Sequence, residues 1–376
     1  MSQRTRIIVV GCGVVGAMVA YELSRCPDLT VTLMDGQLPG HGATGAALGI
    51  LMGVCSQKVK GRNWRLREAS LRRYHTLLPE LAALGFSVPY NAQGILSVCF
   101  DRAVLPRWES LQAIRELQGW PLEIWKPEQV AAACPHLAPD QIAAGIYSPC
   151  DRQIAPKALT QALVQAAAGN GVTCRFQEAV TGFELGWDQN CDDQRSLGER
   201  CVQAVTTLRE TYAADRVVLT AGLGTGALTA MLAQPLPLGP VLGQGMRVRV
   251  TSPLGDPQFQ PVINGDDVHL VPLGGGEYGV AATVEFPPEE GMALEPDSDL
   301  LQALWQRAIA YCPALAQAEI LETWHGLRPR PQGRAAPVIE PLAGFTNVLL
   351  ATGHYRNGVF LAPATAAIVR DWVRGQ

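Results

Sequence analysis

The sequence predicts an α/β fold whose parallel sheet is assembled from segments that lie far apart along the chain. Three observations favour this class. An apolar, β-branched run leads into a glycine motif at the N-terminus, two later apolar runs at 216–220 and 348–351 each end in small residues, and a hairpin pattern occupies 266–286. A chain of 376 residues is long enough for two domains or for one large α/β domain.

The segment RIIVVGCGVVGAMVAYELSRCPDLTVTLMDG, residues 6–36, has the order strand, tight turn, helix, strand. Gly11, Gly13 and Gly16 form a G-x-G-x-x-G motif, in which they provide the turn, the close approach of the backbone to a pyrophosphate, and the packing of the helix on the strand. Asp35 follows at the spacing of about 20 residues that suits a ribose diol. The pattern predicts a dinucleotide, FAD or NAD, against the alternative of a structural glycine turn.

A small-residue segment, PGHGATGAALGILMG at 39–53, contains five glycines. It is too poor in large side chains to form a core, but its backbone can lie against a flat ring. The alternative interpretation is a flexible loop. Further along, 171–185 and 201–215 have strand patterns on either side of a polar loop at 186–200. We therefore expect a nucleotide-binding domain that is discontinuous along the chain.

The segment ATGHYRNGVFLAPATA, residues 351–366, sets four consecutive polar residues between two glycines. A turn at 353–357 between a buried strand and an apolar helix explains the pattern. The helix then begins at the carboxyl ends of the strands, where open α/β sheets bind ligands, and its positive end favours an anionic group. The alternative is a capped C-terminal helix with exposed polar residues.

The motifs GATGAALGILM (42–52), ETWHGLRP (322–329) and ATGHYRNGVFLAPAT (351–365) resemble the D-amino-acid oxidase superfamily of FAD enzymes, most of all its glycine oxidase branch, and the resemblance covers essentially the whole chain. It implies a discontinuous Rossmann-like FAD-binding domain and a mainly antiparallel β-sheet domain with helices that covers the isoalloxazine ring. The first would comprise 1–85, 146–235 and 325–376, and the second 86–145 and 236–324.

The resemblance also assigns cofactor contacts. It implies that the three motif glycines bind the pyrophosphate, that Asp35 binds the adenosine ribose, and that Val180 holds the adenine through its backbone. The remaining residues implied to line the cofactor are Thr44, Gly45, Ala46, Gly222, Gly353, His354, Arg356, Asn357 and Gly358. Cys312 does not match the cysteine that carries covalent flavin in sarcosine oxidases, so we expect noncovalent FAD.

For the substrate, the resemblance implies three catalytic-site residues. Arg328 stands where the family pairs an arginine with the substrate carboxylate, a task that suits the planar guanidinium fork, and Arg356 is the second candidate. His269 stands where relatives commonly carry a Tyr over the substrate. Without the family, each arginine fits a surface or structural ion pair, and His269 fits a half-buried sheet residue.

The match is weaker around RPRPQGRAAP, residues 328–337, where relatives usually have Thr or Ser and then Asp after Arg-Pro. Here Arg330 and Arg334 are introduced, and Leu273 replaces a residue that is often basic. An arginine at the mouth of the pocket favours a larger or more acidic substrate than glycine. These departures affect the expected substrate and leave the expected fold and cofactor unchanged.

The expected reaction is oxidation of an amino acid or N-methyl amino acid to the imine by hydride transfer to flavin N5, with electrons passed to O2 or another acceptor. Three alternatives remain: a 2-hydroxy-acid or amino-acid dehydrogenase that reduces a quinone, the tRNA-modifying relative of the superfamily, and a non-catalytic flavin-binding protein.

Composition limits the partners of the chain. The formal net charge of −4 predicts no nucleic-acid partner, which also disfavours the tRNA-modifying alternative. The ten cysteines include no C-x-x-C pair and no zinc-ligand spacing, so we expect no metal and a reducing, cytoplasmic location. No apolar stretch of about 20 residues predicts a membrane span. The oligomeric state stays open, a homo-oligomer included.

Overall fold

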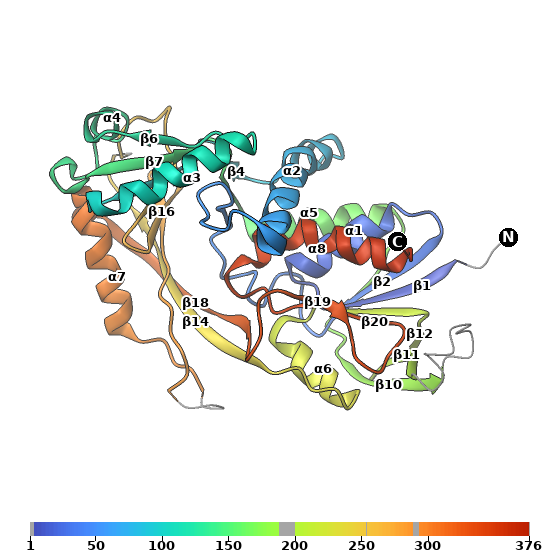
Figure 1. Cartoon of the computed structure of the whole chain (residues 1–376). Coiled ribbons are helices and arrows are strands. Elements are labelled where there is room, and N and C mark those ends of the chain that lie inside the picture. The colour runs from blue at the N-terminus through green and yellow to red at the C-terminus, as the bar shows by residue number, and fades with distance from the viewer. Residues whose placement is uncertain (1–3, 188–199, 253, 289–292, 376) are drawn as a thin grey trace.

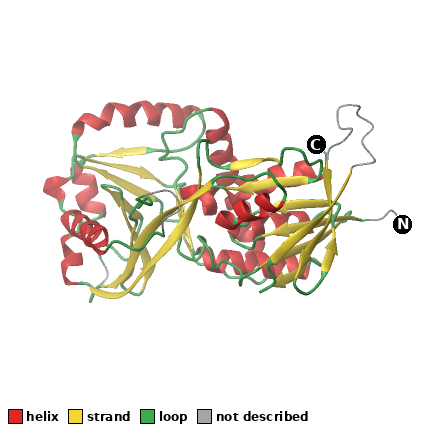
Figure 2. Ribbon diagram, turned by 90° about the horizontal axis from the view of Figure 1, so that it is seen from below, coloured by secondary structure: helices red, strands yellow, loops and turns green. Residues whose placement is uncertain are grey.

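The computed structural model describes residues 4–187, 200–252, 254–288 and 293–375. Two large β-sheets lie side by side, each with helices packed against it (Figures 1 and 2). The six-stranded sheet lies at the end of the molecule that carries both chain termini, and the eight-stranded sheet lies at the other end (Figure 1). The α/β class predicted from the sequence is confirmed.

The six-stranded sheet has the order β19-β20-β13-β1-β2-β9 and is parallel except for the β19–β20 pair. Its strands are β1 Thr5–Val10, β2 Leu29–Asp35, β9 Thr173–Phe176, β13 Arg216–Leu219, β19 Val338–Pro341 and β20 Val348–Thr352. The carboxyl ends of β1, β2, β13 and β20 therefore meet at one edge. This edge carries the glycine motif, Asp35 and the turn after β20.

Both faces of this sheet are covered, because the central strand β1 is apolar on both sides. Ile7 and Val9 belong to the core under one set of helices, and Ile8 and Val10 belong to the core on the opposite face. The first set of helices is α1 Val14–Ser24, α2 Gly61–Ala83, α5 Pro156–Gly169 and α8 Gly358–Val373. Helix α1 packs between α5 and α8, which explains why it is buried on nearly all sides.

The opposite face is covered by an antiparallel three-stranded sheet and by α6. These elements are β10 Val180–Trp187, β11 Arg200–Thr207, β12 Thr211–Ala213 and α6 Thr225–Met231. The strand pattern predicted at 171–185 is divided between β9 and β10, because the chain turns at Gln177, whose φ is 56°. Most of the polar loop expected at 186–200 lies outside the described residues.

The eight-stranded sheet has the order β18-β14-β17-β16-β15-β5-β7-β6, and all neighbouring strands are antiparallel except β15 and β5. Its strands are β5 Ile95–Cys99, β6 Glu123–Trp125, β7 Ala144–Ser148, β14 Leu238–Arg249, β15 Val262–Gly265, β16 Val268–Gly274, β17 Glu277–Ala281 and β18 Glu319–Pro331. Helices α4 (Pro127–Ala133) and α7 (Ser298–Tyr311) cover its outer face, where their apolar residues form one core with the strands. The hairpin predicted at 266–286 corresponds to β16 and β17.

A small sheet and one more helix connect the two halves. Strand β8 (Arg152–Ile154) pairs with both β3 (Ile50–Leu51) and β4 (Tyr90–Asn91), and α3 (Leu105–Leu117) contributes Leu111 to the core shared with the first set of helices. The predicted domain boundaries after residues 145 and 324 fall inside β7 and β18. The division into two domains stays a prediction.

No helix among the described residues is long and apolar enough to cross a membrane. In the same part of the chain, His, Cys, Asp and Glu side chains form no group of three or more that could hold a metal ion.

Candidate active site

The glycine motif forms a tight turn between β1 and α1. Gly11 has a φ of 107°, and a Cβ on it would lie 2.6 Å from the backbone of Ala221. A Cβ on Gly16 would overlap the carbonyl oxygen of Gly11, and it would also come within 2.6 Å of the Thr220 hydroxyl. The first turn of α1 can therefore approach β1 only because both positions lack a side chain. This agrees with the roles predicted for the first and third glycines.

Gly13 precedes helix α1 as its N-cap residue and provides no side-chain cap, and the first turn of the helix contains no acidic residue. The N–H of Val14 donates to Thr44 Oγ1 over 3.0 Å. At the end of β2, Asp35 Oδ2 accepts from the N–H of Cys12 over 2.6 Å, and Oδ1 accepts from the N–H of Gln37 over 2.8 Å. Thr44 and Asp35 thus hold the loop in place, and the lone pairs that remain on their oxygens are available to a ligand.

The predicted adenine-side residue Val180 lies beside the end of β2. The N–H of Glu178 donates to the carbonyl of Asp35 over 3.0 Å. A Cβ on Gly36 would lie 3.1 Å from the Cβ of Ala179. The structure therefore brings Val180 and Asp35 to the same part of the sheet edge, as expected for residues at one end of a dinucleotide.

The glycine-rich segment, residues 42–55, runs from the nucleotide-binding edge across the inner face of the eight-stranded sheet. Leu48, Ile50 and Met52 pack against the inner-face residues Ile95, Val262 and Val271. Nearer the edge strand β18, the indole Nε1 of Trp324 donates to the carbonyl of Ala46 over 3.0 Å. A Cβ on Gly326 would overlap the side chain of Ala46. The segment and β18 are therefore in close contact.

The inner face of this sheet is lined by small residues next to polar ones. Directly paired residues of neighbouring strands share a face, and one row across the sheet consists of Trp324, Gly245, Ala281, His269, Asn264 and Ser97. The adjacent row pairs Gly326 with Gly243. A Cβ on Gly243 would overlap the guanidinium group of Arg328. The arginine side chain therefore fits against β14 only because residue 243 is a glycine.

Arg328 is held rigidly in that space. Its Nη1 donates to the carbonyl of Leu242 over 2.9 Å, and its Nη2 donates to the carbonyl of Thr283 over 3.1 Å. A guanidinium has five N–H donors, so others remain for a ligand. Burial and the nearby charge of Arg356 lower the pKa of Arg328, while Tyr355 and Glu285 act in the opposite direction.

His269 lies beside the same cationic group. Burial, together with the nearby charge of Arg356, lowers the pKa of His269 to about 4, so the imidazole is neutral near pH 7. Its Nδ1 is buried without a hydrogen-bond partner among the described residues. An orphaned buried nitrogen is costly unless a ligand group meets it. Arg356 thus lies within electrostatic range of both Arg328 and His269, although the three residues come from different elements.

The turn after β20 contains the short helix η5 (Tyr355–Asn357), and it differs from the sequence-based expectation at one position. His354 is buried, with 4% of its surface exposed, and its Nε2 is 2.8 Å from Thr365 Oγ1 in α8. The side chain of His354 therefore cannot line the cofactor, contrary to what the resemblance implied for this residue. Helix α8 packs under the turn and takes up this imidazole, so only the backbone of His354 can contribute to a cofactor site.

The glycines of this region allow the two sheets to meet. Gly353 has a φ of 63°, and a Cβ on it would lie 2.7 Å from Pro331 at the end of β18. Gly222, in the short helix η3 (Gly222–Gly224), has a φ of 57°, and its carbonyl accepts from Thr352 Oγ1 over 3.2 Å. The predicted flavin-side residues Gly222, Gly353 and Arg356 therefore lie where β13, β20 and β18 come together.

A family model described as FAD dependent oxidoreductase (DAO) matches residues 6–372. The chain belongs to the DAO family. It is 32% identical over 390 residues to the Bifunctional protein ThiO/ThiG of a Synechocystis strain, covering 100% of this chain and 52% of that protein. It is 26% identical over 379 residues to the glycine oxidase of Bacillus licheniformis, covering 100% and 94%. The chain spans about half the length of the bifunctional relatives it matches.

Solved structures agree with the DAO fold. A glycine oxidase from Geobacillus kaustophilus has a TM-score of 0.83 at 24% identity, covering 99% of this chain and 95% of its own. An L-proline dehydrogenase from P. horikoshii has a TM-score of 0.84 at 21% identity, covering 100% and 95%. The predicted family, the fold and the dependence on FAD are confirmed, and the chain is an FAD-dependent oxidoreductase of the DAO family.

The residues of this DAO-family chain fit FAD. The turn at Gly11 has no side chain and the first turn of α1 has no acidic residue, which suits a pyrophosphate. The remaining lone pairs of Asp35 suit a ribose. On the inner face, the orphaned nitrogen of His269 suits a polar group of a bound substrate. The individual cofactor and substrate contacts stay predictions.

Two buried charged residues hold the glycine-rich segment, and the sequence analysis missed both. Asp151 accepts from the N–H groups of Gly53, Val54 and Cys55 over 2.7, 2.8 and 2.9 Å. Arg115, which is fully buried, donates through Nε to the carbonyl of Val54 over 2.8 Å and through Nη2 to Ser56 and Lys58. Burial lowers the pKa of Arg115 to about 10. We call this arrangement the Asp151–Arg115 clamp.

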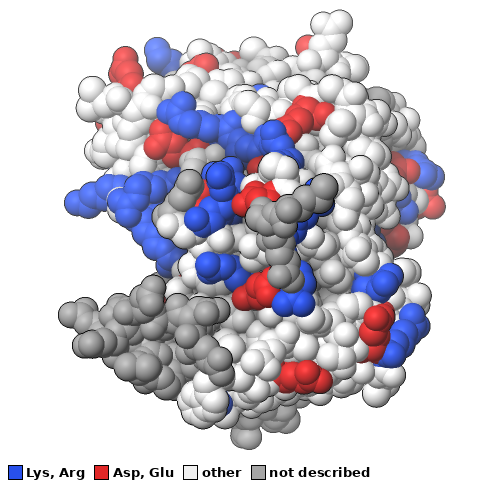
Figure 3. Space-filling model, turned by 90° about the vertical axis from the view of Figure 1, so that its right-hand side faces the viewer, with Lys and Arg blue, Asp and Glu red and all other residues white. Residues whose placement is uncertain are grey.

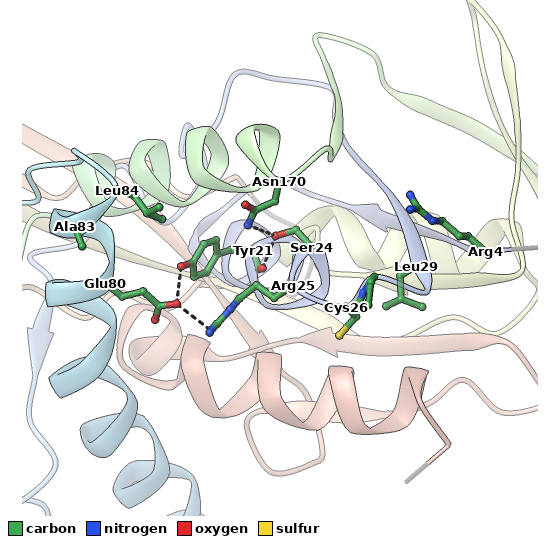
Figure 4. Close-up of a pocket in the computed structure, with 11 residues that line it drawn as sticks. Arg4, Tyr21, Ser24, Arg25, Cys26, Leu29, Glu80, Ala83, Leu84 and Asn170 are labelled. Carbon is green, nitrogen blue, oxygen red and sulfur yellow. Dashed lines mark hydrogen bonds and ion pairs between the residues drawn. The ribbon is translucent and has the colours of Figure 1, made fainter. Parts of the chain in front are cut away.

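A separate surface hollow of about 590 Å³ lies at the amino ends of β1 and β2 (Figure 4). Its walls are tied together by Glu80, which accepts from Tyr21 Oη over 2.9 Å and pairs with Arg25 over 3.0 Å. Ligands of open α/β sheets bind at the opposite, carboxyl ends of the strands. We therefore assign this hollow a structural origin in the packing of the helix ends.

The face of the molecule that carries both termini shows basic and acidic side chains close together (Figure 3). Ion pairs such as Arg6 with Asp215 and Arg73 with Glu22 balance charge in the nucleotide-binding half. These pairs are structural, in contrast to the arginines of the candidate active site, which bind carbonyl groups or lie exposed.

Proposed function

We propose that this chain oxidises an amino acid or N-methyl amino acid, of the glycine, sarcosine or D-amino-acid type, to the corresponding imine. The observation that carries the proposal is the meeting of Arg328, Arg356 and neutral His269 on the small-residue face of the eight-stranded sheet, opposite the glycine-rich segment. When FAD is bound, its N5 supplies the hydride acceptor. The protein supplies the binding and orientation of the substrate.

The substrate carboxylate is the natural partner of the two arginines. Arg328 and Arg356 are close enough for the charge of one to lower the pKa of the other, so their guanidinium groups repel. A carboxylate between them relieves that repulsion. Because two backbone carbonyls fix Arg328, its remaining donors are oriented before the substrate arrives, which reduces the entropy cost of binding.

His269 is suited to the amine of the substrate. A hydride can leave Cα only when the amine has lost its extra proton, because its lone pair must form the C=N bond. The neutral imidazole can accept a hydrogen bond from that amine through its unpartnered Nδ1. This contact orients the Cα–H bond, and no side chain needs to abstract the Cα proton.

After oxidation, water hydrolyses the imine and releases ammonia or methylamine. We propose O2 as the acceptor that regenerates the oxidised cofactor and yields H2O2. The curated relatives and solved structures named glycine oxidase support both the substrate class and this acceptor. A quinone-reducing enzyme acting on a 2-hydroxy acid or an amino acid is the second candidate. Parallel assays of ammonia and H2O2 distinguish the two.

The first experiment is an anaerobic titration of the purified flavoprotein, with glycine, sarcosine, a panel of D- and L-amino acids and then 2-hydroxy acids added one at a time. We expect at least one of them to bleach the visible flavin band. If the flavin is reduced by 2-hydroxy acids and by none of the amines, the second candidate replaces the proposal. If nothing reduces it, a non-catalytic role as a flavin-binding protein follows.

We also propose that the FAD is held noncovalently. Cys312 is buried in the outer-face core of the eight-stranded sheet, in contact with apolar residues from α7 and the following turn. Acid precipitation should leave the yellow colour in the supernatant, and a yellow pellet would contradict this. The cytoplasmic location stays a prediction, which cell fractionation tests.

A further inference from the structure

Strand β18 carries a second arginine on the same face as Arg328. Side chains alternate along a strand, so Arg328 and Arg330 point to one side and are separated by roughly 7 Å along it. Their partners across the sheet are Val241 and Gly239. The space beside Gly239 is taken by Gln332, whose Nε2 would lie 3.0 Å from a Cβ on that glycine.

The guanidinium group of Arg330 is held without a counter-charge. It lies over the ring of Phe286, with 5.1 Å between Cζ and the ring centroid, and both residues are exposed. No hydrogen bond or ion pair joins it to another residue in the described part of the chain. Stacking on an aromatic ring orients a guanidinium and leaves the N–H donors at its edge unused. Arg330 is thus an oriented cation with free donors.

Arg334, in the loop after β18, and Arg249, at the opposite end of β14, differ in this respect. Arg334 Nη2 pairs with Glu340 Oε1 over 2.6 Å, and Arg249 pairs with Glu277 over 2.5 Å. Their charges are balanced by carboxylates of the protein itself. Arg330 therefore stands out on the strand that also carries the proposed carboxylate-binding Arg328.

We propose that Arg330 binds a second carboxylate of the substrate, and that the preferred substrates are amino acids or secondary amines with two carboxylates. This inference rests on the proposed function, which places the first carboxylate on Arg328. The spacing of the two arginines suits carboxylates separated by about two or three bonded atoms, as in aspartate, glutamate or iminodiacetate. A substrate with one carboxylate leaves Arg330 in water.

The exposed position of Arg330 determines the size of the effect. A partly solvated ion pair contributes less than a buried one, so Arg330 should select among substrates by about tenfold and should not be essential for turnover. The fork geometry of arginine makes the contact bidentate, and lysine should replace it only in part. Arg330 is in this sense a specificity-determining residue.

The test compares kcat/KM for D-aspartate, D-glutamate and iminodiacetate with kcat/KM for glycine and sarcosine. The intact enzyme should favour at least one dicarboxylate. Arg330→Met keeps an apolar stem against Phe286 and should lower the ratio of dicarboxylate to monocarboxylate kcat/KM by about tenfold, with Arg330→Lys in between. Arg334→Met, whose parent residue is paired with Glu340, is the matched control and should leave the ratio unchanged.

A binding measurement separates this inference from the proposed function. Succinate and propionate are not amines, and each can be titrated into the oxidised holoenzyme while the flavin absorption band is followed. Succinate should bind about tenfold more tightly than propionate, and Arg330→Met should remove the difference. Equal binding of the two acids, or a ratio unchanged by Arg330→Met, overturns the inference. Failure of every amine to reduce the flavin overturns the proposed function alone.

Discussion

The six-stranded sheet holds its predicted phosphate and ribose residues within one strand–turn–helix–strand unit, whereas the eight-stranded sheet draws its substrate residues from separate strands. In the first, Gly11 and Gly16 act through backbone geometry and steric fit. In the second, His269 and Arg328 act through charge and hydrogen bonding. Steric fit of a backbone tolerates almost no change, while charged side chains on a sheet can be exchanged without loss of the fold. Cofactor binding should therefore fail abruptly on mutation, and substrate choice should change gradually.

The largest expected effect is that of Gly16→Val. Its side chain would overlap the carbonyl of Gly11 and crowd the hydroxyl of Thr220, so α1 must move away from β1. We expect a loss of more than about 3 kcal/mol in the free energy of unfolding, together with loss of bound FAD. Thermal unfolding and the flavin-to-protein absorbance ratio measure both. Gly169→Ala is the control, because a Cβ there meets open space. Its free energy of unfolding should stay within about 0.5 kcal/mol of the wild type, and its flavin-to-protein absorbance ratio should be unchanged.

The next effect is that of Arg328→Met. We expect the variant to retain FAD and to lose substrate saturation by more than about a hundredfold, because a carboxylate in a partly dry pocket is left without its partner, at a cost of roughly 3–5 kcal/mol. Steady-state kinetics and flavin content measure the two properties. Arg249→Met, at the far, exposed end of β14, is the matched control. Normal KM in Arg328→Met would falsify the assignment of the carboxylate site.

A smaller effect concerns pH and His354. Burial and the charge of Arg62 lower the pKa of His354 in the folded protein to about 3, from 6.5 when unfolded, so the folded state disfavours the protonated imidazole. Its contribution to stability is complete above about pH 6.5 and is lost as the pH falls toward the folded pKa, by about 2 kcal/mol between pH 6.5 and 5.

Urea unfolding at several pH values measures this slope. His354→Gln should reduce the loss of stability between pH 6.5 and 5 by most of that amount, whatever its effect on stability at pH 7. The same change at exposed His41 should leave the slope as it is. An unchanged slope in His354→Gln contradicts a neutral, buried imidazole at this position.

The smallest effect is that of Thr44→Val, which removes the acceptor of the Val14 N–H at the start of α1. The loss of one partly compensated hydrogen bond should lower the free energy of unfolding by about 1 kcal/mol. If Thr44 also contacts the cofactor, the free energy of FAD binding should weaken by a similar amount. Thr211→Val, on the exposed strand β12, is the control and should have little effect on either quantity.

Much of the nucleotide-binding half could be predicted from the sequence because its signals are local. The strand, the three glycines and Asp35 follow one another within 6–36, and each residue type has one dominant physical reason to be there. The turn at 353–357 was predicted for the same reason. The inward orientation of the His354 side chain was not predicted. It depends on a contact with Thr365 in helix α8, and no sequence pattern marks that threonine as a partner.

The substrate half was less accessible to prediction from the residues alone. Arg328 and His269 share one face of the sheet because of the register of β14, β16, β17 and β18, which places Gly243, Gly245 and Ala281 between them. That register cannot be predicted from the sequence pattern alone. Arg115 was missed for a different reason. It lies in an ordinary amphipathic helix pattern, in which an arginine is expected to face solvent.

The Asp151–Arg115 clamp couples the stability of the two halves of the molecule. The backbone of the glycine-rich segment is held on its amide side by a residue that follows β7 and on its carbonyl side by a residue from α3. The same segment packs on the inner face of the eight-stranded sheet. Cofactor binding and the integrity of that distant layer are then thermodynamically linked, and linkage is reciprocal. Added FAD should slow amide hydrogen exchange in α3 and β7, and loosening either element should raise the dissociation constant of FAD.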